Sequence, residues 1–147
     1  METLLISACL LGENCKYNGG NNALSPQTLD ALRKRYELIP VCPEQAGGLP
    51  TPREPSERQK NGVFTRSGRN VTAEYRRGAE TALALMREHR CKTALLKERS
   101  PSCGSGQIYD GSFSGTLIPG DGTAAEALKQ AGVIVYGESR WRELLEE

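Results

Sequence analysis

The chain has little of what marks a membrane, secreted or nucleic-acid-binding protein. Its 19 Lys and Arg residues against 18 Asp and Glu leave a net charge of +1, so a strongly basic grip on nucleic acid is not its bulk character. Aromatic residues make up only 5% of it, which leaves few rings for stacking on unpaired bases. Its apolar runs are far shorter than the roughly 20 residues of a membrane helix. We therefore expect no membrane association.

The N-terminal segment has no basic leader followed by a long apolar stretch, so no secretory signal is predicted and a cytoplasmic location is expected. Thiols stay reduced in that compartment. Five cysteines, an odd number, therefore argue against a disulfide framework and favour metal binding or catalysis. The length of 147 residues suits one domain, which we take to span residues 1–147.

Short apolar segments alternate with helical patterns along the chain. Strands are predicted at residues 3–8, 37–41, 92–97 and 133–136. Four helices are predicted. The first begins at Ser25-Pro26 and the second spans residues 72–89. The third opens with a capping box of Thr123 and Glu126, and the fourth with a cap at Ser139. Strands separated by helices require crossover connections and hence parallel pairing. The pattern predicts an α/β fold, a three-layer, mostly parallel, Rossmann-like sheet with helices on both faces.

Two long connections complete the prediction. Residues 43–68 are rich in proline and glycine, and we expect them to be mostly loop. Residues 101–122 are rich in glycine and serine, and we expect a small hairpin near residues 109–113.

Parallel sheets bind ligands at the carboxyl ends of their strands, and three cysteines follow three predicted strands. Cys9 and Cys42 come just after the first and second strands, and Cys103 lies in the loop that leaves the third. We expect these three thiols to converge at one edge of the sheet. Cys91 precedes the third strand, so it is expected at the opposite edge as a buried residue. Cys15 lies in a loop at the ligand-binding edge, either as a fourth ligand, as a thiol beside the ligands or as a packing residue.

A site of three thiolates suits zinc, copper(I) or an iron–sulfur cluster. Three protein ligands leave one metal position open for a substrate, as in catalytic sites. Glu44, two residues after Cys42, is a candidate proton donor or acceptor, with capping of a loop amide as the alternative. Ser100 and Ser102 place two hydroxyl groups beside Cys103, and turn formation is the alternative role for both.

The only histidine, His89, is predicted at the end of a helix near the opposite edge of the sheet. A cysteine–histidine catalytic pair needs direct contact between the two side chains. We therefore expect His89 to be a solvated residue at the helix end.

Five motifs, in order along nearly the whole chain, resemble one bacterial family. They are SACLLGENCKYNG (residues 7–19), VCPEQAGGLPTPREP (41–55), GRNVT (68–72), LKERSPSCG (96–104) and IYDGSFSG (108–115). The family has long been labelled only as a domain of unknown function, and its characterised members are [4Fe–4S]-dependent desulfidases acting on thiouracil.

The resemblance implies a [4Fe–4S] cluster held by Cys9, Cys42 and Cys103, with its fourth iron free of protein ligands. Cys15 also belongs to the family pattern and remains a candidate ligand. Glu44 matches the position of the family's active-site acid or base. Ser100, in the fourth motif, matches the position of its active-site hydroxyl.

The implied reaction removes sulfur from a thiolated uracil base or nucleoside, converting the thiocarbonyl to a carbonyl and releasing hydrosulfide without redox chemistry. A small thiolated pyrimidine is the expected partner. Thiouridine in transfer RNA is the alternative substrate, and a non-catalytic zinc or iron–sulfur module is the alternative function. Arg53, Lys97 and Ser102 are further candidate substrate contacts, although Arg53 and Lys97 are equally well explained as solvated side chains. Nothing in the sequence indicates the oligomeric state.

Overall fold

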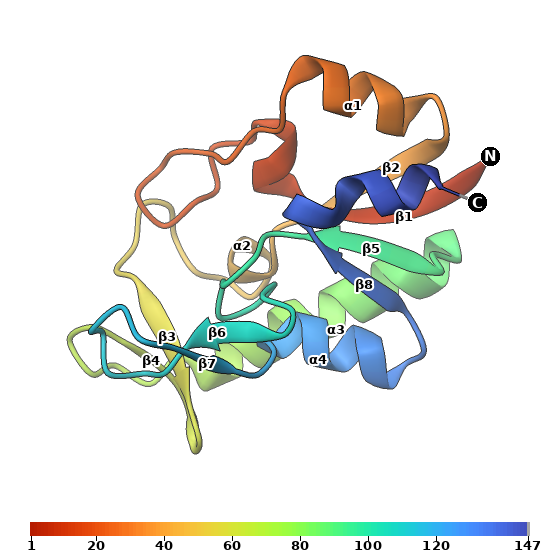
Figure 1. The fold of residues 1–147 in the computed structure, drawn as a ribbon. Coiled ribbons are helices and arrows are strands. Elements are labelled where there is room, and N and C mark those ends of the chain that lie inside the picture. Colours follow the sequence, from red (N-terminus) through yellow and green to blue (C-terminus); the bar gives the residue numbers. More distant parts are fainter. Residues whose placement is uncertain (147) are drawn as a thin grey trace.

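A parallel sheet forms the centre of the protein. The computed structural model describes residues 1–146, and its main sheet has four strands in the order β2-β1-β5-β8 (Figure 1). The strands are β1 (Glu2–Ser7), β2 (Tyr36–Val41), β5 (Thr93–Leu96) and β8 (Ile134–Gly137), all paired in parallel. Each observed strand overlaps one predicted strand.

Helices cover both faces of this sheet (Figure 1), which confirms the three-layer α/β prediction. One face carries α3 (Thr72–His89) and α4 (Thr123–Gln130), and the other carries α1 (Pro26–Arg33) and the 3-10 helix η2 (Glu138–Leu145). Two apolar cores result. Leu5 of β1 packs in the core below α3 and α4, while its neighbours Leu4 and Ile6 pack in the core on the α1 side. This alternation follows from the period of a strand.

The connections hold more regular structure than the sequence predicts. They contain the 3-10 helix η1 (Ala8–Leu11), the short helix α2 (Pro43–Ala46) and the antiparallel hairpins β3 (Ser56–Gln59)–β4 (Gly62–Thr65) and β6 (Gln107–Tyr109)–β7 (Leu117–Pro119). Residues 43–68 are still mostly loop, as expected, but the sequence did not predict α2 or the β3–β4 hairpin within them. The short, polar strand β3 lacks the alternation of apolar residues by which strands are predicted.

Two of the predicted helix caps have different outcomes. Ser25 caps α1 as predicted, because its Oγ accepts the backbone N–H of Thr28 at 3.1 Å. The predicted cap at Ser139 is wrong, since η2 begins at Glu138 and the Ser139 hydroxyl donates instead to Oε2 of Glu98 at 2.6 Å.

The predicted capping box of Thr123 and Glu126 is also wrong. The backbone amides of Ala124 and Ala125 donate to the carbonyl oxygen of Ser102 at 2.8 and 3.0 Å. A loop carbonyl thus satisfies amides at the start of α4 that a side chain would otherwise cap. This contact fixes the loop after β5 to the N-terminus of α4.

Helix α2 packs against α3 through backbone atoms. A Cβ added at Gly78 would lie 2.0 Å from the carbonyl oxygen of Pro43, and one added at Gly47 would lie 1.9 Å from the carbonyl oxygen of Glu74. Only glycine allows this approach at either position. The two helices are therefore held together at the point where α2 begins, next to Cys42.

No helix within residues 1–146 has both the length and the apolar character that crossing a membrane requires.

We predict that Gly78→Ala destabilises the protein by about 1–3 kcal/mol, because the new methyl group overpacks the α2–α3 contact. At an unconstrained helical position the same change would stabilise by up to about 1 kcal/mol. Urea denaturation measures the difference. Arg76→Ala, at an exposed position of the same helix, is the control and should stay within about 0.5 kcal/mol of the wild type. A Gly78→Ala variant more stable than the wild type would contradict the contact.

Candidate active site

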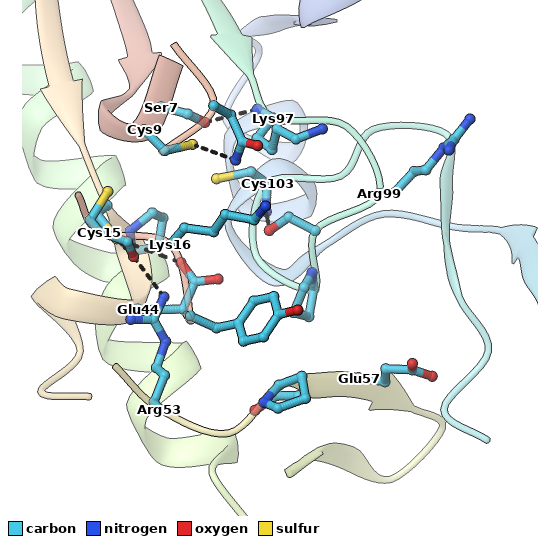
Figure 2. Close-up of a pocket in the computed structure, with 18 of the residues that line it drawn as sticks. Ser7, Cys9, Cys15, Lys16, Glu44, Arg53, Glu57, Lys97, Arg99 and Cys103 are labelled. Atoms are coloured by element: carbon cyan, nitrogen blue, oxygen red, sulfur yellow. Dashed lines mark hydrogen bonds between the residues drawn. The ribbon is translucent and has the colours of Figure 1, made fainter. Parts of the chain in front are cut away.

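A cavity of about 670 Å³ lies at the carboxyl ends of β1, β2 and β5. Its volume falls within the usual range of small-molecule pockets, roughly 300–1,000 Å³. Four of the five cysteines line it, namely Cys9, Cys15, Cys42 and Cys103. Figure 2 labels Cys9, Cys15 and Cys103. The structure thus brings together the three cysteines predicted to converge, with Cys15 beside them.

Cys9 enters the cavity from η1, directly after β1. The turn ends at Gly12, whose φ of 97° is in the left-handed region that favours glycine. The side-chain amide of Asn22 donates to Sγ of Cys9 at 3.5 Å. Burial raises the pKa of the Cys9 thiol above its ordinary value, and the Asn22 hydrogen bond partly offsets this effect.

Cys42 is the N-cap residue of α2 and follows β2 directly. Its thiol lies 3.9 Å from Oε2 of Glu44 and donates to the carbonyl oxygen of Cys15 at 3.7 Å. Burial is the main cause that raises the pKa of Cys42, and the nearby carboxylate of Glu44 raises it further. A cation bound at this thiol would favour its ionised form.

Cys103 lies in the loop that is fixed to α4, with 4% of its surface exposed. The Ser100 hydroxyl shapes this loop, since its Oγ accepts the backbone N–H groups of Ser102 at 3.1 Å and of Cys103 at 3.0 Å. Burial raises the pKa of Cys103 to about 12, with a smaller contribution from the charge of Glu44.

Two serines and Glu44 form a hydrogen-bonded chain behind the cysteines. Ser102 Oγ donates to Oε1 of Glu44 at 2.8 Å and lies 3.0 Å from Oγ of Ser100. Ser100 accepts two amides already, so its own hydrogen is the one shared with Ser102. Glu44 and Ser100 line the cavity, and their catalytic roles remain predictions. Ser102 is 0% exposed, so its position supports Glu44 and does not match the predicted contact with substrate.

Arg53 and Lys97 also line the cavity, but both are held by protein groups. The guanidinium of Arg53 donates to the carbonyl oxygen of Cys15 at 3.0 Å, and Nζ of Lys97 lies 3.1 Å from Oε1 of Glu138. Arg53 thus stabilises the loop that contains Cys15. Cys15 is itself buried, with 3% of its surface exposed. A direct contact of either cation with substrate remains a prediction.

Cys91 and His89 lie away from the cavity, as predicted from their place before β5. Cys91 is 4% exposed and packs in the core below α3 and α4. The backbone carbonyl of His89 accepts the hydroxyl of Thr3, near the amino end of β1, at 2.6 Å. Neither residue is positioned to bind a group held by the other four cysteines.

The chemistry of the donor set fits an iron–sulfur cluster, because such clusters are held by cysteine thiolates. Among residues 1–146, no three His, Cys, Asp or Glu side chains are close enough to bind one metal ion together. A cubane cluster is bound at separate iron atoms, so its thiolates need not converge on one point. A donor also lies at one of the sulfur atoms, since the side-chain amide of Asn22 donates to Sγ of Cys9 at 3.5 Å. Such donors stabilise bound thiolates.

Comparisons with known proteins agree with this geometry. A sequence model of the 2-thiouracil desulfurase family matches residues 4–140. This chain belongs to the 2-thiouracil desulfurase family. An uncharacterised protein of Bacillus subtilis (strain 168), YbbK, is 41% identical over 152 residues, which cover 97% of this chain and 99% of that protein. A solved structure named as the [4Fe–4S]-dependent thiouracil desulfidase TudS is 47% identical, with a TM-score of 0.94, covering 99% of this chain and 96% of that one.

Sequence reasoning did not assign the opposite wall of the desulfurase pocket. That wall is built by the two hairpins, and its lining includes Glu57, Arg66, Tyr109 and Phe113. The only signal for it was the motif IYDGSFSG, which holds Tyr109 and Phe113 but indicates no role by composition. Lys16 and Arg99 also line the pocket; both fall within motifs of the family, but neither was assigned a role.

We predict that Ser102→Ala lowers the free energy of unfolding by about 1–3 kcal/mol, because it leaves the buried Glu44 carboxylate without its hydroxyl donor. Chemical denaturation under reducing conditions measures the loss. Ser105→Ala is the matched control in the same loop, since Ser105 is only half-buried, and it should change stability by less than about 0.5 kcal/mol. Equal effects of the two substitutions would show that the Ser102–Glu44 hydrogen bond contributes nothing.

Proposed function

We propose that this chain is a [4Fe–4S]-dependent desulfidase that replaces the thiocarbonyl sulfur of a thiolated uracil with oxygen. Its membership of the 2-thiouracil desulfurase family and its 47% identity to the [4Fe–4S]-dependent thiouracil desulfidase support this function. One observation of the site carries it. Three thiols from three strand ends line one pocket together with a carboxylate and a hydroxyl group.

Cys9, Cys42 and Cys103 are the proposed cluster ligands, because each is placed by a different element at the same edge of the sheet. We assign Cys15 a supporting role. Its carbonyl oxygen accepts hydrogen bonds from Cys42 and Arg53, so its loop positions a ligand whether or not its own sulfur binds iron. When bound, a cluster with one iron free of protein ligands supplies a Lewis acid for the thiocarbonyl sulfur.

Glu44 is the proposed acid and base. Its Oε1 is fixed by the Ser102 hydroxyl, while Oε2 lies on the side of Cys42. A carboxylate held in this way can accept a proton from the attacking water and return it during product formation. The balance requires no electrons, since one thiocarbonyl and one water give one carbonyl, one hydrosulfide and one proton.

Ser100 is proposed to orient the water or an atom of the base. Two backbone amides fix its oxygen, and its hydrogen is shared with Ser102. The oxygen is therefore preorganised on the lining of the cavity, where the water or an atom of the base can bind it.

A free base or nucleoside is the proposed substrate class. A cavity of about 670 Å³ suits a molecule of that size. The net charge of +1 offers no strong attraction for a polyanion. We also propose a cytoplasmic location, a proposal supported by the odd number of five cysteines, which suits a reducing compartment.

The ligand set has a direct test. After anaerobic reconstitution, Cys9→Ala, Cys42→Ala and Cys103→Ala are each expected to lose most bound iron and the absorption at roughly 400 nm that thiolate–iron charge transfer gives. Cys91→Ala and Cys15→Ala are expected to retain both. Iron and acid-labile sulfide analysis measure the outcome. Stoichiometric zinc without iron in the wild type would refute the cluster and favour a non-catalytic zinc module.

The activity is tested by sulfide release from 2-thiouracil, from 4-thiouridine and from thiolated transfer RNA. We expect release from the small molecules with the reconstituted wild type. Glu44→Gln should keep the cluster but lose at least about 100-fold in turnover, in line with the usual contribution of general acid–base catalysis. Turnover of transfer RNA alone would overturn the proposed substrate class, and an iron-loaded wild type that releases no sulfide would overturn the activity.

A further inference from the structure

The loop between β6 and β7 carries a residue in a strained backbone conformation. Phe113 has a φ of 58°, in the left-handed region that side chains other than glycine rarely adopt. Bulky residues remain in such conformations only where the surrounding structure holds them, and such positions cluster at ligand sites. The site and mechanism described above make no use of this residue.

A carboxylate from the neighbouring hairpin holds this conformation. Oε1 of Glu57, on β3, accepts the backbone N–H of Gly111 at 2.9 Å and that of Phe113 at 3.1 Å. The side-chain amide of Gln59 donates to the carbonyl oxygen of Gly111 at 3.0 Å. A Cβ at Gly111 would lie 2.5 Å from Cγ of Gln59, so the two hairpins approach as closely as a glycine permits. These hydrogen bonds join the β6–β7 loop to strand β3.

The strained residue faces the same cavity as the cysteines. Phe113 is half-buried and lines this cavity together with Glu57 and Arg66. Figure 2 shows Glu57 on the side of the pocket away from Cys9 and Cys103. The backbone N–H of Phe113 binds Glu57, so Phe113 lines the pocket next to Glu57.

The electrostatics of this wall also suit a planar, polar ring. The guanidinium carbon of Arg66 lies 5.8 Å from the centroid of the Phe113 ring, within reach of a cation–π contact. A heterocyclic base can stack on an aromatic side chain whatever its hydrogen-bonding pattern. A base bound against this wall can direct its thiocarbonyl group toward the thiols across the cavity.

We propose that Phe113 is a substrate-binding residue on which the pyrimidine ring stacks, and that Glu57 is the positioning residue that holds Phe113 in place. The inference rests on the proposed function, because it assumes that the ligand is a planar base. The motif IYDGSFSG, which contains Phe113, would then form part of the substrate-binding wall. Glu57 on β3 would hold it in place.

The test compares two Phe→Leu substitutions in the reconstituted holoenzyme, each of which removes a ring but keeps apolar volume. Phe113→Leu is expected to raise KM for 2-thiouracil roughly tenfold, the usual scale of base–aromatic stacking, with little change in kcat or iron content. Phe64→Leu is the matched control, since Phe64 lies on β4 outside the pocket lining, and its KM should stay within about twofold of the wild type. Phe113→Tyr keeps the ring and should restore KM.

Glu57 is tested through its coupling to Phe113. Glu57→Ala should also raise KM, whereas Glu57→Gln, which keeps an acceptor oxygen, should raise it less. If Glu57 acts through Phe113, the double variant Glu57→Ala/Phe113→Leu should have the KM of Phe113→Leu alone. If the KM increases of the two single variants instead multiply in the double variant, Glu57 does not act through Phe113 and the positioning role is overturned.

A binding measurement separates this inference from the proposed activity. Equilibrium dialysis of labelled uracil against the holoenzyme should give a weaker affinity for Phe113→Leu than for Phe64→Leu, even if the wild type releases no sulfide from any thiolated base. Lack of sulfide release would count against the activity alone. Equal KM values and equal uracil affinities for the two variants would overturn the proposal that the base stacks on Phe113. The proposed desulfidase activity would be unaffected by that result.

Discussion

The parallel pairing of β1 with β2 and β5 is the constraint on which the site depends. Ser7 pairs with Val41, and Ile6 pairs with Leu95, so the three strands end at nearly the same level. The chain must leave each strand at this edge before it crosses over a face of the sheet. Three cysteines that are remote in sequence therefore follow strand ends that lie side by side at one edge of the sheet. Short local structures then position each thiol in the pocket. These are a 3-10 turn, the start of α2 and a loop fixed to the N-terminus of α4.

The electrostatics of this edge disfavours ionised thiols until a cation binds. Burial raises the pKa of every cysteine at the pocket, and the charge of Glu44 adds to the effect at Cys42 and Cys103. Two cations on the lining, Arg53 and Lys97, are already engaged by a carbonyl group and a carboxylate. Binding of iron cations supplies the charge that ionised thiols need.

The sequence predicted what depends on pattern and chain order, and missed what depends on close tertiary contact. Strand positions, both helical layers and the convergence of the cysteines followed from apolar periodicity and from the geometry of parallel sheets. The capping box of Thr123 failed because the carbonyl of Ser102, distant in sequence, accepts the amides of α4. The role of Ser102 and the conformation of Phe113 likewise depend on Glu44 and Glu57, partners far along the chain. No local pattern encodes such pairs.

The central claim is that three thiolates hold a cluster whose remaining iron is open to substrate. Mössbauer spectroscopy of the ⁵⁷Fe-reconstituted protein, before and after addition of 2-thiouracil, tests it most directly. The account predicts that one iron of the four differs from the other three, and that added thiouracil changes the signal of that iron. Four equivalent irons, or a spectrum that thiouracil leaves unchanged, would contradict it.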